Sequence, residues 1–347
     1  GMSLLTGVGM VAGGIRLLGR KYHLIGQGLI GGGLATLYFS AFAAVNLFHL
    51  ITVTPGFALM AFITFSAGVF AVRFDSILIA VLGIIGGFAT PIMLSTGGKN
   101  FPALFSYMLL LGFGILGISH KKHWHLLNGL GMLCTYGLGF AAIEKHYVTP
   151  DFPIVMPFIA AFFVLYSAAT MIYNLVSREK ATLLELLGLL INAGAFFALG
   201  NNLVAGAYGA KWVGVLSLSL AAFYVAHVYV FLTRKLNDRG LLLSLTGMAT
   251  FFLTITLPLV LSSEWITASW AVQAIVMLWL AGKLDSQFLQ HLSYLIYLLV
   301  MIRFCFLDMG RQFSHAMPPN MLWRDYLGVL VERVVMFGIP LASLASA

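Results

Sequence analysis

Three ionisable side chains, Glu185, His227 and Arg303, lie inside long apolar stretches and are the residues in this sequence best placed to do chemistry. An ionisable group among apolar residues is costly to bury without a partner, so each is a candidate proton, cation or anion site. For Glu185 that role is binding a proton or a cation. The structural alternative, which we expect, is an acid near a membrane surface that pairs with Arg178 or Lys180.

His227 and Arg303 have structural alternatives of the same kind. A lone histidine within an apolar helix serves more often as a neutral hydrogen-bonding group between helices than as a ligand. Arg303 is expected to pair with Asp308 or Glu332, to receive an anionic headgroup, or to extend toward the outer surface. Extension to the surface is the simplest of these expectations.

A second group of residues is expected to line a cavity. Pro91 falls within an apolar stretch, and a proline inside a helix frees carbonyl groups that can face a cavity. Transporters build substrate sites from such interrupted helices. The candidate cavity-lining residues are Gln27, Thr36, Asn46, His49, Thr90 and Pro91. Surface anchoring explains Asn46 and His49 equally well, and a packing hydrogen bond explains Gln27, as it does Asn192.

Motifs of the common enzyme classes are missing from the sequence. It has no phosphate-binding glycine loop followed by Lys-Ser/Thr and no His-Glu-x-x-His. His120, His123 and His125 do not share one helical face, and Lys121 and Lys122 between them oppose cation binding, so no metal site is expected. We therefore expect no cofactor, assign no catalytic residue and do not favour an enzymatic role.

The composition places the chain in a membrane. Hydrophobic residues make up 61% of the sequence and charged residues only 9%, whereas soluble domains carry about 25% charged residues. Long apolar runs without apolar/polar alternation predict helices rather than a β-barrel. The net charge of +8 comes mainly from short connections, so membrane lipids are the expected partners and nucleic acid is not.

The apolar runs predict an all-α, polytopic transmembrane bundle of about thirteen spans, since a span needs about 20 residues. The expected spans are 2–19, 24–50, 55–72, 76–95, 101–118, 126–143, 153–176, 181–204, 212–233, 240–262, 265–282, 287–307 and 326–344. Connections after odd-numbered spans hold 12 basic residues, and those after even spans up to the tenth hold 3. By the positive-inside rule the odd connections are cytoplasmic.

Two glycine-rich stretches repeat the same pattern. Small residues let helix backbones approach closely in lipid, so we expect helix packing at Gly28, Gly31, Gly32, Gly83, Gly86 and Gly87. Both stretches follow a basic connection and run in the same direction. This arrangement predicts a parallel repeat of helical hairpins, with chance resemblance as the alternative.

Residues 1–347 are expected to form a single transmembrane region that belongs to a longer membrane protein. The polar stretch 308–325, with Pro318 and Pro319, is expected to be an outer-side loop, with a short interfacial helix near Trp323 as an option.

Three stretches resemble one family. They are Gln27-Gly28-x-x-Gly31-Gly32-Gly33-Leu34-Ala35, Arg73-Phe74-Asp75-Ser76 leading into Leu82-Gly83-x-x-Gly86-Gly87-Phe88-x-Thr90-Pro91, and Trp270-Ala271-x-Gln273-Ala274. They are similar to runs in the large bacterial membrane proteins of domain of unknown function family 2339. The resemblance implies a helical protein of the bacterial inner membrane and no activity. Gln273 stands where that family commonly has an acid, so no carboxylate role is carried over.

Two functions remain open from the sequence. The first is transport or presentation of a lipidic or cell-envelope solute, with the cavity beside the second and fourth spans. The second is a structural or scaffolding membrane subunit whose glycine faces pack helices against partners, including other membrane subunits.

Overall fold

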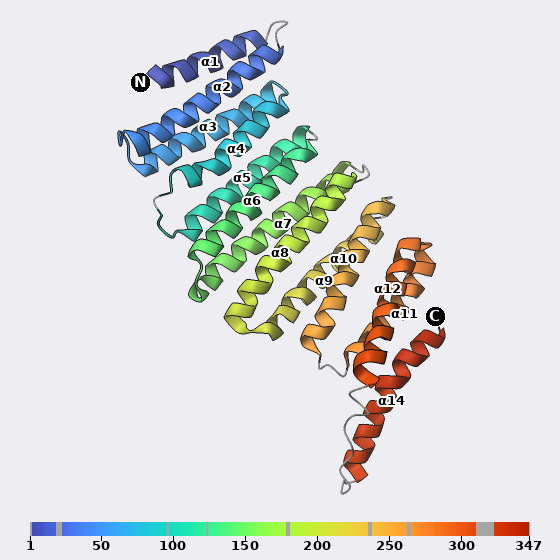
Figure 1. Cartoon of the computed structure of the whole chain (residues 1–347). Coiled ribbons are helices and arrows are strands. Elements are labelled where there is room, and N and C mark those ends of the chain that lie inside the picture. The colour runs from blue at the N-terminus through green and yellow to red at the C-terminus, as the bar shows by residue number, and fades with distance from the viewer. Residues whose placement is uncertain are drawn as a thin grey trace. The chain divides into compact units, whose positions relative to one another are not determined.

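A computed structural model describes residues 2–18, 23–95, 97–122, 124–177, 181–234, 238–261, 265–309 and 323–346. These residues are helical almost throughout and contain no strand (Figure 1). The α-helices are α1 (Met2–Leu18), α2 (His23–Phe42), α3 (Val53–Arg73), α4 (Ile77–Met93), α5 (Phe101–Lys122), α6 (His125–His146), α7 (Phe152–Ser177), α8 (Leu183–Tyr208), α9 (Ala210–Thr233), α10 (Arg239–Val260), α11 (Ile266–Leu284), α12 (Gln287–Arg303) and α14 (Trp323–Ser346). The π-helices η1 (Ala43–Leu47) and η3 (Phe304–Asp308) follow α2 and α12, and the short 3₁₀ helix η2 (Thr149–Asp151) precedes α7.

The all-α membrane architecture predicted from the apolar runs is confirmed, because a helix coincides with each expected span. Ten of the described helical stretches are long and apolar enough to cross a membrane, and α1 and α4 are shorter apolar helices of 17 residues. The last helix begins at Trp323, three residues before the expected start, so the predicted loop 308–325 ends earlier. Residues 310–322 of that loop lie outside the described residues.

The chain divides into two compact units, residues 1–199 and residues 200–347, and the boundary falls within α8. In the first unit α1 packs on α2, α3 on α4, α2 on α4, and α5 on both α6 and α7. In the second unit α9 packs on α10, and α11 packs on both α12 and α14. Each unit is therefore built from neighbouring helical hairpins.

Polar contacts between helix ends show that alternate connections lie on the same side of the first unit. In the first unit, Lys122 pairs with Asp75 at 2.8 Å, at the ends that follow the third and fifth helices. On the opposite side, Lys99 pairs with Asp151 at 2.5 Å, joining the ends that follow the fourth and sixth. This pattern fits a bundle whose helices cross the membrane in alternating directions. Which side is cytoplasmic stays a prediction from the basic residues.

A buried asparagine joins three helices of the first unit. Asn192 of α8 is fully buried, accepts a hydrogen bond from Tyr136 Oη at 2.7 Å, and donates to the Phe163 carbonyl and to Ser167 Oγ at 2.9 Å each. Its amide oxygen and nitrogen are both satisfied, as a buried amide requires. Asn192 thus makes the packing hydrogen bonds expected for it, tying α8 to α6 and α7.

The backbones of α1 and α2 approach each other closely in the first unit. A β-carbon placed on Gly33 would lie 2.9 Å from the Gly7 carbonyl oxygen, and one on Gly14 would lie 2.8 Å from the Gly26 carbonyl oxygen. Only glycine fits such positions. The sequence contains the signal as two glycine pairs spaced by seven residues, one on each helix. These four glycines are not among the packing residues expected from the sequence.

Most of the glycines selected from the sequence also contact a neighbouring helix. A β-carbon on Gly31 would meet Leu82, one on Gly32 would meet Met10, one on Gly83 would meet Ala67, one on Gly86 would meet the Tyr38 ring, and one on Gly87 would meet Thr64. Gly28 differs, because it is exposed and a β-carbon there would meet nothing within 4 Å. In the first unit α2 and α4, which carry the two stretches, run in the same direction (Figure 1) and contact each other. The repeat itself stays a prediction.

Gly33 and Gly28 of α2 offer a matched test of the backbone contact. Alanine is favoured over glycine by about 1 kcal/mol within a helix, so Gly28→Ala is expected to leave stability unchanged or slightly raised. Gly33→Ala is expected to lower the free energy of unfolding by about 1–3 kcal/mol through overpacking against the α1 backbone. Thermal unfolding of both purified variants in the same detergent measures the difference. Equal stability of the two variants would contradict the contact.

Candidate functional site

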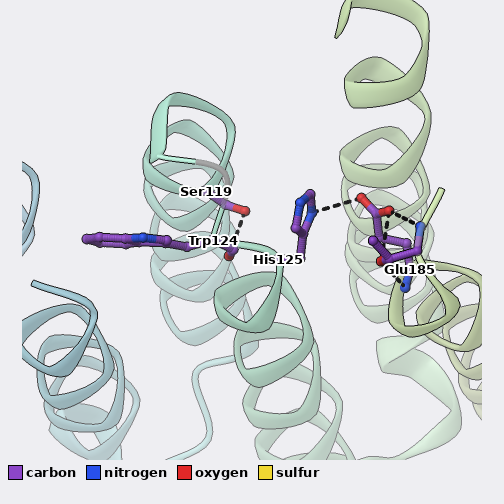
Figure 2. A network of polar contacts seen from close by, with 5 residues as sticks. Ser119, Trp124, His125 and Glu185 are labelled. Carbon is purple, nitrogen blue, oxygen red and sulfur yellow. Dashed lines mark hydrogen bonds and ion pairs between the residues drawn. The ribbon is translucent and has the colours of Figure 1, made fainter. Parts of the chain in front are cut away.

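Glu185 takes part in a polar network at the start of α8 (Figure 2). Thr182 precedes the helix, and its backbone N–H and hydroxyl donate to Glu185 Oε2 at 2.7 and 3.0 Å. The Glu185 N–H in turn donates to Thr182 Oγ1 at 3.4 Å. The two residues form a reciprocal helix cap, in which an acid at the third position satisfies N–H groups left open by the helix start.

The other carboxylate oxygen of Glu185 faces α6. His125 Nδ1 lies 2.9 Å from Glu185 Oε1, and the exposed fractions of the two side chains are 25% and 8%. Ser119 donates to the Trp124 carbonyl at 3.0 Å, which fixes the turn before His125, while the Trp124 indole points away from Glu185 (Figure 2). The pair is therefore a largely buried carboxylate in contact with a histidine of the neighbouring helix.

Within the described residues, Glu185 pairs with His125, and the pairing expected from the sequence stays a prediction. The sequence suggested Arg178 or Lys180, which lie outside those residues, and it did not suggest His125. The Thr182-Leu183-Leu184-Glu185 pattern was available as a cap signal. The histidine was not predictable from spacing, because it comes from a helix about 60 residues earlier. His123, another member of the histidine group, is also outside the described residues.

Pro91 lies in the last turn of α4, where its missing N–H leaves the Gly87 carbonyl without its helical donor. Tyr107 of α5 supplies the replacement, since its hydroxyl donates to the Gly87 carbonyl at 2.9 Å. Thr90 beside the proline is fully buried and donates to the Gly86 carbonyl at 2.9 Å. The interrupted turn is thus closed by a neighbouring helix.

The other four candidate lining residues are spread from the start of α2 to the connection that follows η1. Gln27 is half-buried near the start of α2, and Thr36 donates to the Gly32 carbonyl of its own helix at 2.8 Å. Asn46 donates to the Met93 carbonyl at the end of α4 at 3.0 Å. His49 is exposed and has a positive φ of 46°. Their lining of a solute path stays a prediction.

His227 contacts its own helix in the second unit. Its Nδ1 lies 2.6 Å from the Phe223 carbonyl oxygen, one turn earlier in α9, and its ring lies 4.2 Å from the Phe223 ring. A ring nitrogen that bonds a carbonyl carries a proton and is not a metal ligand in that state.

Arg303 belongs to a charged group in the second unit, here called the Arg303 cluster: Arg303, Asp308, Thr267 and Trp270. Arg303 Nε donates to Thr267 Oγ1 at 3.0 Å, and the Thr267 hydroxyl donates to Asp308 Oδ2. The Arg303 Nη2 to Asp308 Oδ1 distance is 4.0 Å. The wider turn of η3 places Asp308 five residues after Arg303 on the same side of the chain.

Trp270 is held in the cluster by a carbonyl that a second proline leaves without its helical donor. Pro258 near the end of α10 cannot donate to the Thr254 carbonyl. The Trp270 indole N–H donates to that carbonyl at 3.1 Å. The indole so fixed lies 6.0 Å from the guanidinium carbon of Arg303, within the range of a cation–π contact. The sequence analysis named Arg303 with Asp308, and Trp270 only as part of a family-like stretch. It did not name Thr267 or connect either residue of α11 with Arg303.

The comparisons with known proteins agree with this architecture. Residues 1–340 match the family described as "Predicted membrane protein (DUF2339)". The chain belongs to this family. Neither a curated protein nor a solved structure matches the chain. Family membership, together with the apolar helices, makes this a multi-pass membrane protein, and it assigns no activity.

In this DUF2339 member, Gln273 extends the polar surface of α11 beyond the Arg303 cluster. Its amide nitrogen donates to the Thr250 carbonyl at 3.1 Å and to Thr254 Oγ1 at 2.7 Å. The side chain is buried, and its Oε1 accepts no hydrogen bond within the described residues. The amide joins α10 and α11 through neutral hydrogen bonds, without a carboxylate.

The closed turn at Pro91 can be tested by a double-mutant cycle. Tyr107→Phe leaves the buried Gly87 carbonyl without a donor and is expected to lower the free energy of unfolding by about 1–3 kcal/mol. Pro91→Ala restores the N–H that serves this carbonyl, so Tyr107→Phe is expected to be less destabilising in that background. Denaturation of the four proteins in detergent gives the coupling. The same loss in both backgrounds would show that the carbonyl does not depend on Tyr107.

Proposed function

We propose that this protein transports an anionic lipidic or envelope-derived solute across the bacterial inner membrane, and that the Arg303 cluster recognises the anion. The observation that carries the proposal is a guanidinium held within the helices of the second unit by Thr267, Asp308 and Trp270. Charged groups at membrane depth are rare and line the solute paths of many transporters, so this group is a candidate solute site.

Burial distinguishes Arg303 from an arginine that only extends to the membrane surface. Its side chain is 16% exposed, and its Nε is bound to Thr267, which is itself buried. Arg303 is therefore fixed in place before any solute arrives, and a fixed donor loses little conformational entropy on binding.

The contact with Asp308 is loose enough for an exchange of anions. At 4.0 Å, the separation of nitrogen and oxygen exceeds the roughly 2.7–2.9 Å of a close charge-assisted hydrogen bond. A phosphate or carboxylate of the solute would take the place of Asp308 beside the guanidinium. The carboxylate would keep its hydrogen bond from Thr267, so it need not lose every partner during the exchange.

The distribution of basic residues favours an envelope-side position for the cluster. If the odd connections are cytoplasmic, the end of α12 faces outward. A solute of the envelope would then meet Arg303 before it meets the rest of the second unit. The solute's chemistry in this proposal is an anionic head with an apolar body, which suits a guanidinium among lipid-facing helices.

A structural membrane subunit is the second candidate, and the first unit favours it. There the backbones of α1 and α2 touch, and the turn interrupted by Pro91 is closed by Tyr107. On this view Arg303 and Asp308 act only as a clamp between α11 and α12, and other membrane subunits are the partners.

Lipid transfer in proteoliposomes tests the proposed transport. Vesicles containing the protein and fluorescent phosphatidylglycerol are treated with dithionite, which bleaches only the outer leaflet. Wild-type protein is expected to expose inner-leaflet lipid faster than protein-free vesicles. Arg303→Gln should slow this by about 10-fold or more through loss of a charged hydrogen-bond donor, whereas Asp308→Asn should preserve or raise anion binding.

The control is Lys145→Gln, which removes a positive charge at the end of α6, in the first unit. It is expected to transfer lipid like the wild type. A wild-type rate equal to that of protein-free vesicles would contradict transport. Equal loss of rate and of thermal stability in Arg303→Gln and Asp308→Asn would instead support the structural clamp.

A further inference from the structure

The first unit contains an apolar groove formed by α1, α2 and α3, with a volume of about 230 Å³. Its α1 wall runs from Val8 to Ile15, its α3 wall runs from Phe62 to Phe70, and Leu34 of α2 lies at its base. Figure 1 shows α2 between the other two helices, with α1 and α3 running in the same direction. The groove therefore follows the helix axes over α2.

The lining of the groove suits a hydrocarbon chain. Ser66 is the polar member of the lining, and its hydroxyl donates to the Phe62 carbonyl of its own helix at 2.8 Å. At 1.5 Å per residue, the stretch from Phe62 to Phe70 is about 12 Å long. One leaflet contributes about 15 Å to the hydrocarbon core of a bilayer. The groove thus matches an acyl chain of one leaflet in length and polarity.

Two arginines lie beyond the same end of the groove. Arg16 follows Ile15 in the last turn of α1, and Arg73 comes three residues after Phe70 in the last turn of α3. Both side chains are exposed, and neither is ion-paired within the described part of the chain. Because α1 and α3 are parallel, both charges stand at one mouth of the groove, where an anionic headgroup of that leaflet would lie.

We propose that this groove is a binding site for a phospholipid with an anionic headgroup, with one acyl chain along Leu34 and the phosphate at Arg16 and Arg73. Apolar packing alone gives little preference for the groove over bulk lipid, since lipid chains are as apolar as the lining. The arginines supply the preference, at about fivefold for each charge. This site is separate from the Arg303 cluster and does not depend on transport.

Lipid retention measured by native mass spectrometry tests the proposal. The full chain is purified from nanodiscs that contain equal amounts of phosphatidylglycerol, phosphatidylethanolamine and phosphatidylcholine. We expect one phosphatidylglycerol to remain bound preferentially to the wild type. Arg16→Gln and Arg73→Gln are each expected to reduce that preference about fivefold, and the double variant should bind the three lipids alike.

Two further variants distinguish the contribution of the headgroup charge from that of the apolar groove. Lys121, like Arg16 and Arg73, is an exposed basic residue in the last turn of an odd-numbered helix, here α5. Lys121→Gln is expected to keep the preference for phosphatidylglycerol. Ala12→Phe fills the groove and should abolish retention of all three lipids, with Ala12→Leu as the substitute if thermal unfolding shows that the phenylalanine variant does not fold. Equal retention of the three lipids by the wild type would overturn the proposal. So would a lipid-free dimer, or an unchanged lipid complement in the folded Ala12 variant.

Discussion

The structure depends above all on the need of every backbone carbonyl in a membrane-embedded helix for a hydrogen-bond donor. No water is present in the hydrocarbon core to replace a missing N–H group. Pro91 and Pro258 each remove such a donor, and in both cases an aromatic side chain of the next helix replaces it. Tyr107 serves the Gly87 carbonyl, and Trp270 serves the Thr254 carbonyl. A local defect in one helix thereby fixes the position and rotation of its neighbour.

The consequences of this replacement differ between the two units. Tyr107 is buried, and its ring packs edge-on against Phe57 of α3, so its neighbours in the described part of the chain include no charged group. Trp270 has a second neighbour, because the face of its indole is turned to the guanidinium of Arg303. The charged cluster of the second unit is therefore positioned by a proline two helices away along the chain. Pro258 therefore acts neither as a hinge nor as an opening in α10. The carbonyl that it leaves without a helical donor fixes the position of the Trp270 side chain.

The spans and the alternation of helix ends were predictable because hydropathy, charge and proline positions are local properties of the sequence. The helices coincide with the expected spans to within a few residues. The partners of Glu185, Pro91 and Arg303 were harder to predict from the sequence. They are His125, Tyr107 and Thr267, which come from other helices, and no rule of sequence spacing connects the members of each pair. The reciprocal cap of Thr182 and Glu185 was an exception, as its three-residue spacing was readable. What remained unpredictable was which helices become neighbours and with what rotation.

Glycine spacing explains why the first unit has a groove at all. Gly7 and Gly14 let α1 settle onto Gly33 and Gly26 of α2 at backbone contact. On its other side α2 meets α3 through larger side chains, because Tyr38 bonds Thr64 at 2.8 Å across that interface. α1 thus lies closer to α2 than α3 does, and Phe62 and Phe70 of α3 do not fill the space beside α1. In lipid such a space is filled by the surrounding acyl chains, so close packing of one helix pair creates a lipid contact beside it.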